Sequence, residues 1–133
     1  ARAATQAPAG KVADLAQDIA FSNRSSFIID STMRKTQWAD ERFTKARGCR
    51  FRVLLVFIDA SVEVCEERVL EREKKTGRPV QPEFVRDCNL ASRTCVEEFK
   101  YKADLFVHMM NNERLILSDE DASSLREAIA RAI

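Results

Sequence analysis

The chain has 133 residues, of which 45% are apolar and 32% charged, with 22 basic and 21 acidic side chains. This length is typical of one domain, and the apolar content is enough for a packed core, which argues against extensive disorder. The nearly balanced charge argues against a general nucleic-acid-binding or membrane-surface module. The sequence has no run of about 18 apolar residues, and its N-terminus lacks the pattern of a signal peptide.

The cysteines also limit the possible classes of site. Cys49, Cys65, Cys88 and Cys95 include no C-x-x-C pair, which disfavours a structural zinc site. Cys88 and Cys95 lie about two turns apart on a predicted helix, too far for a disulfide. We therefore expect reduced, mostly buried thiols and a cytoplasmic protein.

The first third of the chain combines helical and extended patterns. Residues 1–7 have little pattern, whereas apolar residues recur at helical spacing over 12–20. The short, continuously apolar run Phe27-Ile28-Ile29 is typical of a buried strand in a parallel sheet. A second helix is predicted over 36–47, with Gly48 as its C-terminal stop.

The strongest strand signal is R-V-L-L-V-F-I-D-A, over 52–60. Ser61 suits the N-cap of a following helix. Two prolines predict a loop over 78–82, with Pro82 at a first helical position. The elements expected after it are a helix over 82–102, a strand over 105–110, a turn at 111–112, a minor strand over 115–117 and a last helix from Ser118 or Asp119.

The alternation of strands and helices predicts right-handed βαβ units. We therefore predict a single α/β domain over 1–133, in which helices flank a parallel sheet in three layers. Such sheets bind ligands outside the carboxyl ends of their strands. This rule selects four places, namely residues 30–35, residues 59–61, the loop over 78–82 and the turn at 111–112.

The segment after the first predicted strand carries groups that could bind a metal and an anion. Asp30 lies where Mg²⁺ or its water shell takes an oxygen ligand. Thr32 adds a hydroxyl, and Arg34 adds a guanidinium group that can pair with phosphate or carboxylate. The alternative is that Asp30 caps a turn and Arg34 is solvated, because caps are common at strand ends.

Three arginines gather at a helix end and in the loop beyond it. Arg68 and Arg72 are one turn apart and repel each other by about 0.2–0.5 kcal/mol, a cost that a bound anion would remove. Arg78 lies in the loop, and a mobile arginine can neutralise charge on a transferring phosphoryl group. The alternative is a solvated face with Glu71 and Glu73 as local partners.

Asn111 and Asn112 follow a predicted strand at the same sheet edge. Their amides could read a nucleotide base, although asparagine also favours plain turns. His108 has no partner in the sequence that would make it a ligand, so we interpret it as structural. The aromatic residues assigned to the core are Trp38, Phe84 and Phe99.

These segments together resemble the zeta-toxin family of P-loop kinases over about residues 27–112. I-I-D-S-T-M-R-K-T-Q is similar to the strand-end motif of that family, and R-V-L-L-V-F-I-D-A-S-V-E-V-C-E-E-R-V to its following strand and helix. E-R-E-K-K-T-G-R-P-V-Q-P-E resembles its arginine-bearing lid, here over 68–82. L-F-V-H-M-M-N-N resembles the strand and asparagine turn beside the adenine.

The resemblance implies transfer of a phosphoryl group from ATP or GTP, with Mg²⁺, to a small hydroxyl-bearing acceptor. In toxins of the family the acceptor is a nucleotide-linked amino sugar. Asp30 stands where several toxins carry Glu, which keeps the charge but shortens the reach. The implied roles are acceptor binding for Thr32 and Arg34, a catalytic or magnesium role for Asp30, phosphate contacts for Arg72 and Arg78, and nucleotide binding for Arg68, Asn111 and Asn112.

The sequence contains no G-x-x-x-x-G-K-[ST] phosphate loop. In the family, the backbone amides and lysine of that loop hold the phosphates. We therefore expect an N-terminally incomplete P-loop kinase-like domain, inactive alone, whose partner is the missing N-terminal half. The alternatives are a non-catalytic binding or scaffolding module of a larger protein, and a nucleic-acid end-processing kinase with a basic groove. The acceptor, the choice of ATP or GTP and the oligomeric state stay open.

Overall fold

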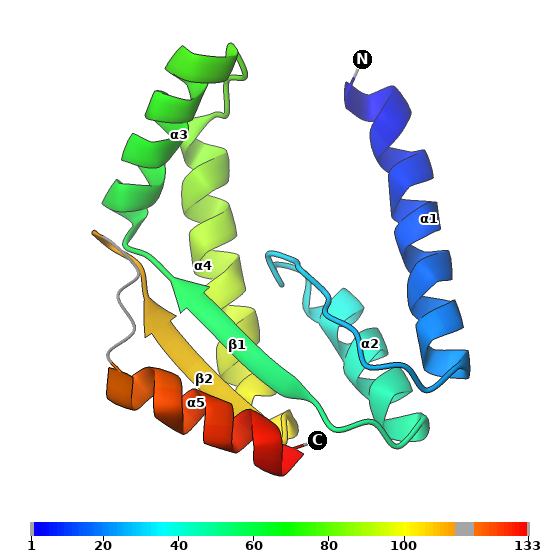
Figure 1. Cartoon of the computed structure of the whole chain (residues 1–133). Coiled ribbons are helices and arrows are strands. Elements are labelled where there is room, and N and C mark those ends of the chain that lie inside the picture. Colours follow the sequence, from blue (N-terminus) through cyan, green and yellow to red (C-terminus); the bar gives the residue numbers. More distant parts are fainter. Residues whose placement is uncertain (1, 114–118, 133) are drawn as a thin grey trace.

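The computed structural model describes residues 2–113 and 119–132. Figure 1 shows α3 and α4 as a helical hairpin that rises from the carboxyl end of β1, with α5 along the sheet and α1 on the opposite side of the molecule. The elements in order are α1 (Arg2–Ser22), α2 (Thr36–Gly48), β1 (Leu54–Asp59), α3 (Val62–Thr76), α4 (Pro82–Phe99), the 3₁₀ turn η1 (Lys100–Lys102), β2 (Leu105–Met110) and α5 (Asp119–Ala132).

The strands β1 and β2 pair in parallel, in a register that runs from Leu54 opposite Leu105 to Asp59 opposite Met110. The helices α3 and α4 form the crossover between them, which confirms the predicted βαβ unit and the α/β class. The sheet of the described residues has these two strands. The wider three-layer sheet stays a prediction.

The main core lies between one face of this sheet and the helices α2 and α4. Phe99 is completely buried, and its ring centroid lies 5.0 Å from that of Phe43. Trp38 packs against this core as expected, whereas Phe84 is 48% exposed, so its assignment to the core was wrong. The buried residues of this core cluster are Ala39, Phe43, Leu55, Cys95, Val96 and Phe99.

The predicted strand at 27–29 is wrong, because this segment forms no ladder with β1 or β2. Phe27 instead packs edge-on against Phe21 and Phe51, with ring centroids 4.9 and 6.1 Å away. Ile28 is 95% exposed. An apolar run becomes a strand only where its backbone groups find a neighbouring strand, and the described sheet offers none here.

Two helix ends also differ from the sequence prediction. α1 begins at Arg2 and passes through Pro8, so residues 2–7 are helical where the sequence showed little pattern, consistent with their high alanine content. α2 ends at Gly48, but the left-handed residue is Arg50, with φ of 60°. The N–H groups of Arg50 and Phe51 donate to the carbonyls of Arg47 and Ala46, each at 2.9 Å, which is a Schellman motif.

The predicted minor strand over 115–117 and the cap residue Ser118 lie outside the described residues. No described helix combines the length and the apolar character needed to span a bilayer.

Candidate functional site

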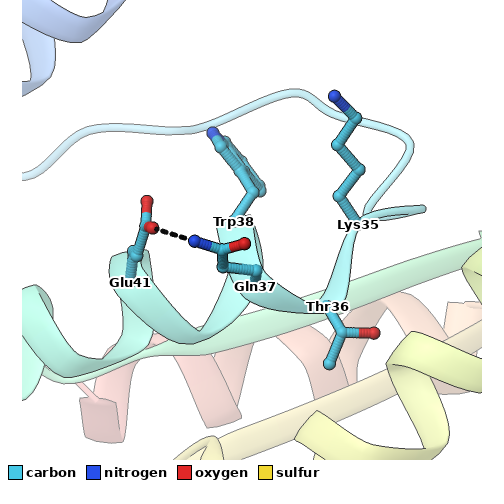
Figure 2. A pocket seen from close by; sticks show the side chains of 5 residues that line it. All are labelled: Lys35, Thr36, Gln37, Trp38 and Glu41. Atoms are coloured by element: carbon cyan, nitrogen blue, oxygen red, sulfur yellow. Dashed lines mark hydrogen bonds between the residues drawn. The ribbon is translucent and has the colours of Figure 1, made fainter.

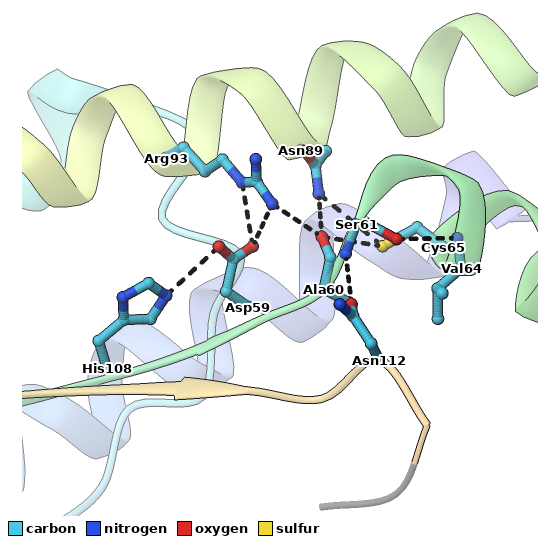
Figure 3. A network of polar contacts seen from close by, with 9 residues as sticks. All are labelled: Asp59, Ala60, Ser61, Val64, Cys65, Asn89, Arg93, His108 and Asn112. Atoms are coloured by element: carbon cyan, nitrogen blue, oxygen red, sulfur yellow. Dashed lines mark hydrogen bonds and ion pairs between the residues drawn. The ribbon is translucent and has the colours of Figure 1, made fainter.

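The carboxyl end of β1 carries a buried aspartate with two partners (Figure 3). Asp59 is 7% exposed. Arg93 of α4 donates from Nε to its Oδ1 at 3.0 Å and from Nη2 to the carbonyl of Ala60 at 3.1 Å. The ring Nε2 of His108 lies 3.3 Å from Oδ2. A buried carboxylate requires this compensation, because burial without a partner would strongly destabilise its charge.

His108 therefore has a partner that its sequence neighbours do not reveal. Its ring stacks on Phe57, opposite it in the sheet register, with centroids 5.2 Å apart and planes 24° apart. About half of its side chain (46%) is exposed. The structural interpretation is compatible with this placement, in which the ring reaches from within β2 to Asp59 at the carboxyl end of β1.

The turn after β2 is tied to the start of α3. Ser61 caps α3 as predicted, since its Oγ accepts from the N–H of Val64. Its own N–H donates to Oδ1 of Asn112 at 2.8 Å. Arg68 of α3 donates from Nη2 to Oδ1 of Asn111 at 3.3 Å and to the carbonyl of Asn112 at 3.2 Å. The structure thus brings together the three residues that were predicted to bind the nucleotide.

Residues 30–34, here called the acceptor-side segment, contact α4 at two points. Ser92 donates from Oγ to the carbonyl of Thr32 at 2.5 Å, and the guanidinium carbon of Arg34 lies 5.1 Å from the centroid of the Phe84 ring. Asp30 is exposed, with no side-chain contact to the rest of the described residues within hydrogen-bonding distance. The segment therefore presents Asp30, Thr32 and Arg34 at the surface.

A shallow depression of about 430 Å³ lies just beyond this segment, over the first turn of α2 (Figure 2). Gln37 donates from Nε2 to Oε1 of Glu41 at 3.2 Å across its floor. None of the predicted site residues lines it, and it lacks a converging set of charged groups. We assign no site to it. The lining residues are Lys35, Thr36, Gln37, Trp38 and Glu41.

The predicted lid arginines Arg72 and Arg78 are exposed on the α3–α4 hairpin. Gly77 ends α3 in the left-handed conformation, with φ of 64°. The loop that follows lies at the end of the hairpin far from the sheet (Figure 1). In this structure the loop therefore does not reach the carboxyl ends of the strands. Arg86 of α4 holds Glu66 of α3 with Nε 2.5 Å from Oε1, and this contact raises the pKa of Arg86.

The described residues contain no group of three or more His, Cys, Asp or Glu side chains that could hold a metal ion. A protein-only cage is not what Mg²⁺ requires, since it commonly takes one or two carboxylates together with substrate phosphates and water. The exposed Asp30 could supply one such oxygen.

Comparison with known families identifies the family of this chain. The model of the zeta toxin family matches residues 1–121. The chain belongs to the zeta toxin family. The members are P-loop kinase-like, nucleotide-dependent phosphotransferases, and the resemblance seen in the sequence is confirmed. No curated protein and no solved structure matches the chain.

In this chain of the zeta toxin family, the sequence did not predict that polar residues of α4 bind the end of β1 and the acceptor-side segment. The missed residues are Asn89 and Arg93, which hold the end of β1, and Ser92, which holds Thr32. A signal for the first pair was present. Asn89 and Arg93 are one turn apart on the face that carries the buried Val85 and Val96, and a polar pair on a buried face needs buried partners.

Proposed function

We propose that this chain supplies the acceptor-side and lid groups of a kinase that transfers a phosphoryl group from ATP or GTP to a small hydroxyl-bearing acceptor, such as a nucleotide-linked sugar. The observation that carries this proposal is the attachment of the 30–34 segment to α4 through Ser92. The same helix holds the carboxyl end of β1 through Arg93. One rigid helix thus links the acceptor side of the site to the sheet edge where this fold class binds ligands.

The individual roles follow from charge and exposure. The Thr32 hydroxyl and the Arg34 guanidinium bind the acceptor, the latter by paired hydrogen bonds to phosphate. Asp30 acts beside them as a catalytic carboxylate and a ligand of Mg²⁺, which when bound neutralises charge on the nucleotide phosphates. Arg72 and Arg78 reach the transferring phosphate when the end of the α3–α4 hairpin far from the sheet bends toward it, while α4 stays fixed at Arg93. Arg68, Asn111 and Asn112 form the nucleotide side.

The phosphate cradle must come from a further segment, the missing N-terminal half of the same domain. Two features of β1 support this. It pairs with β2 along one edge only among the described strands. Leu54, Val56 and Ile58, on one of its faces, are 38%, 40% and 55% exposed. An added strand would pair with the open edge and widen the sheet, and helices added with it would cover the aliphatic face, as in the three-layer form.

The second candidate is a non-catalytic binding or scaffolding module of a larger protein. The observation that favours it is the lack of G-x-x-x-x-G-K-[ST] in these 133 residues. Both candidates use the same fold, and they differ in whether nucleotide is turned over.

The test takes the natural protein from its source, determines its intact mass and assays transfer of labelled phosphate from ATP and from GTP, with and without Mg²⁺. A larger mass and Mg²⁺-dependent transfer support the kinase. In that protein, Asp30→Asn should abolish most transfer while the fold survives, whereas Asp87→Asn, at an exposed position of α4, should not. Wild-type transfer by Asp30→Asn removes this residue from the site, and lack of any transfer by the natural protein favours the scaffold.

A further inference from the structure

The acceptor-side segment has an unusual backbone at its centre. Met33 adopts φ of 47°, a left-handed conformation that L-residues other than glycine rarely take. This conformation costs roughly 1–2 kcal/mol. Its N–H donates to Oγ of Ser31 at 3.2 Å, a local bond that closes the turn. Strain of this kind persists only where surrounding contacts hold it, and such positions cluster at functional sites.

Because Met33 is left-handed, its side chain and those of its two neighbours point in different directions. Met33 itself is half-buried and packs against the core cluster. Thr32 and Arg34, on either side of it, are exposed. The turn therefore fixes the segment to the core by its middle residue while the two proposed acceptor-binding groups face the solvent.

The contact that holds this turn from outside comes from α4. Ser92 donates from Oγ to the carbonyl of Thr32 at 2.5 Å, across 60 positions of sequence. The next residue, Arg93, is fixed by the buried Asp59. Ser92 therefore belongs to a part of α4 that cannot shift without breaking the ion pair between Arg93 and the buried Asp59.

We propose that Ser92 is a positioning residue for the acceptor site. By fixing the Thr32 carbonyl, it holds the strained turn at Met33 and so sets the directions in which Thr32 and Arg34 meet a phosphate-bearing acceptor. This inference rests on the proposed function, in which those two residues bind the acceptor. It adds a residue of α4 that touches no substrate but determines how tightly the acceptor is held.

The test compares Ser92→Ala with Ser92→Thr, which keeps the hydroxyl. The matched control is Thr94→Ala, because Thr94 lies on the same helix and, among the described residues, its hydroxyl bonds only the carbonyl of Leu90, 3.0 Å away in the preceding turn. Inorganic pyrophosphate serves as the probe for the phosphates of the acceptor. For each variant of the chain, NMR gives the affinity for pyrophosphate and the fast backbone motion of residues 31–34, and the thermal midpoint is measured separately.

Ser92→Ala should increase the motion of residues 31–34 and weaken pyrophosphate binding about tenfold, the effect of losing about 1.4 kcal/mol. Ser92→Thr should restore both, and Thr94→Ala should change neither. The thermal midpoints of Ser92→Ala and Thr94→Ala should be similar. A segment that stays ordered with unchanged affinity in Ser92→Ala overturns the inference.

Arg34→Ala separates failure of this inference from failure of the proposed function. If Arg34→Ala abolishes pyrophosphate binding and Ser92→Ala leaves it intact, only the role of Ser92 is overturned. If the chain does not bind pyrophosphate, or if Arg34→Ala binds it normally, the acceptor role of the segment is overturned and the role of Ser92 falls with it.

Discussion

Arg93 of α4 holds the buried carboxylate of Asp59 through two guanidinium nitrogens, Nε and Nη2, each 3.0 Å from Oδ1. The two partners differ in environment, because the side chain of Asp59 is 8% exposed and that of Arg93 is 43% exposed. Loss of either partner therefore has unequal consequences. Without Asp59, the Arg93 side chain can reorient into the solvent. Without Arg93, Asp59 stays buried, and the partly exposed His108 is its remaining side-chain partner among the described residues.

We predict that Arg93→Met destabilises the chain more than Asp59→Asn does. Arg93→Met leaves a buried charge short of its main partner, and we expect a loss of about 2–4 kcal/mol. Asp59→Asn removes the charge but keeps a hydrogen-bonding side chain, and we expect about 1–2 kcal/mol. Urea unfolding of both single variants and the double variant measures the coupling. Equal losses, or the reverse order, would show that burial of Asp59 does not govern the pair.

The sequence was sufficient to predict elements whose pattern is local. The strand β1, the cap at Ser61 and the start of α4 at Pro82 follow from local composition and turn residues. The parallel pairing of β1 with β2 follows from the alternation of strands and helices along the chain. The segment at 27–29, which was wrongly predicted as a strand, is similarly apolar. What it lacked was a neighbouring strand, and pairing is a property of the fold that a single segment does not contain.

The candidate site was predictable only in part for a similar reason. Arg68, Asn111 and Asn112 were selected because they lie at strand and helix ends, and the structure brings them together. Ser92 and Arg93 lie in the middle of a helix, where a polar residue is most often solvated. Their partners Thr32 and Asp59 are 60 and 34 positions away, and only the packing of α4 makes them neighbours.

The contacts of Asp104 predict that the chain loses stability at acidic pH. Hydrogen bonds from Arg47 and from the N–H of Val53 hold the pKa of Asp104 below its usual value of 3.8. A carboxyl group whose pKa is depressed by folding stabilises the folded chain above its unfolded pKa, and this contribution is lost as pH falls through the folded pKa. Asp104→Asn should therefore reduce the difference between the free energies of unfolding at pH 6 and pH 3.

Arg47→Met removes the main cause of that pKa shift, so it should also reduce the difference between pH 6 and pH 3. Because Asp104 keeps the bond from Val53, at 2.6 Å, the reduction should be smaller than in Asp104→Asn. Urea titrations at the two pH values measure both. A full wild-type difference in Asp104→Asn would assign the acid sensitivity to other carboxyl groups.

At the end of α2, we predict that one substitution to glycine and one substitution of glycine both stabilise the chain. Arg50 adopts the left-handed conformation, so Arg50→Gly should stabilise the chain by about 1 kcal/mol. Gly48 is the last helical residue of α2, and a Cβ there would meet no atom within 4 Å, so Gly48→Ala should stabilise the chain by about 0.5–1 kcal/mol. Thermal unfolding checks both. Destabilisation by Arg50→Gly would mean that the Arg50 side chain contributes more than the backbone strain removes.

The lid assignment gives the last prediction, for the natural protein in which phosphate transfer is measured. Arg78 follows the left-handed Gly77 in an exposed loop, away from the core. Arg78→Ala should therefore change the free energy of unfolding by no more than about 0.5 kcal/mol. If Arg78 neutralises charge on the transferring phosphate, kcat should fall on the order of 100-fold.

Lys75→Ala is the matched control, because Lys75 is an exposed cation in the last turn of α3, close to the same loop. It removes one positive charge, as Arg78→Ala does, but it lacks the planar guanidinium group that forms paired bonds to phosphate. Its kcat should stay within about threefold of wild type, on the scale expected for a screened surface charge. Equal losses in the two variants would point to general attraction of the nucleotide by positive charge. An unchanged kcat in Arg78→Ala at saturating nucleotide would remove Arg78 from the phosphate site.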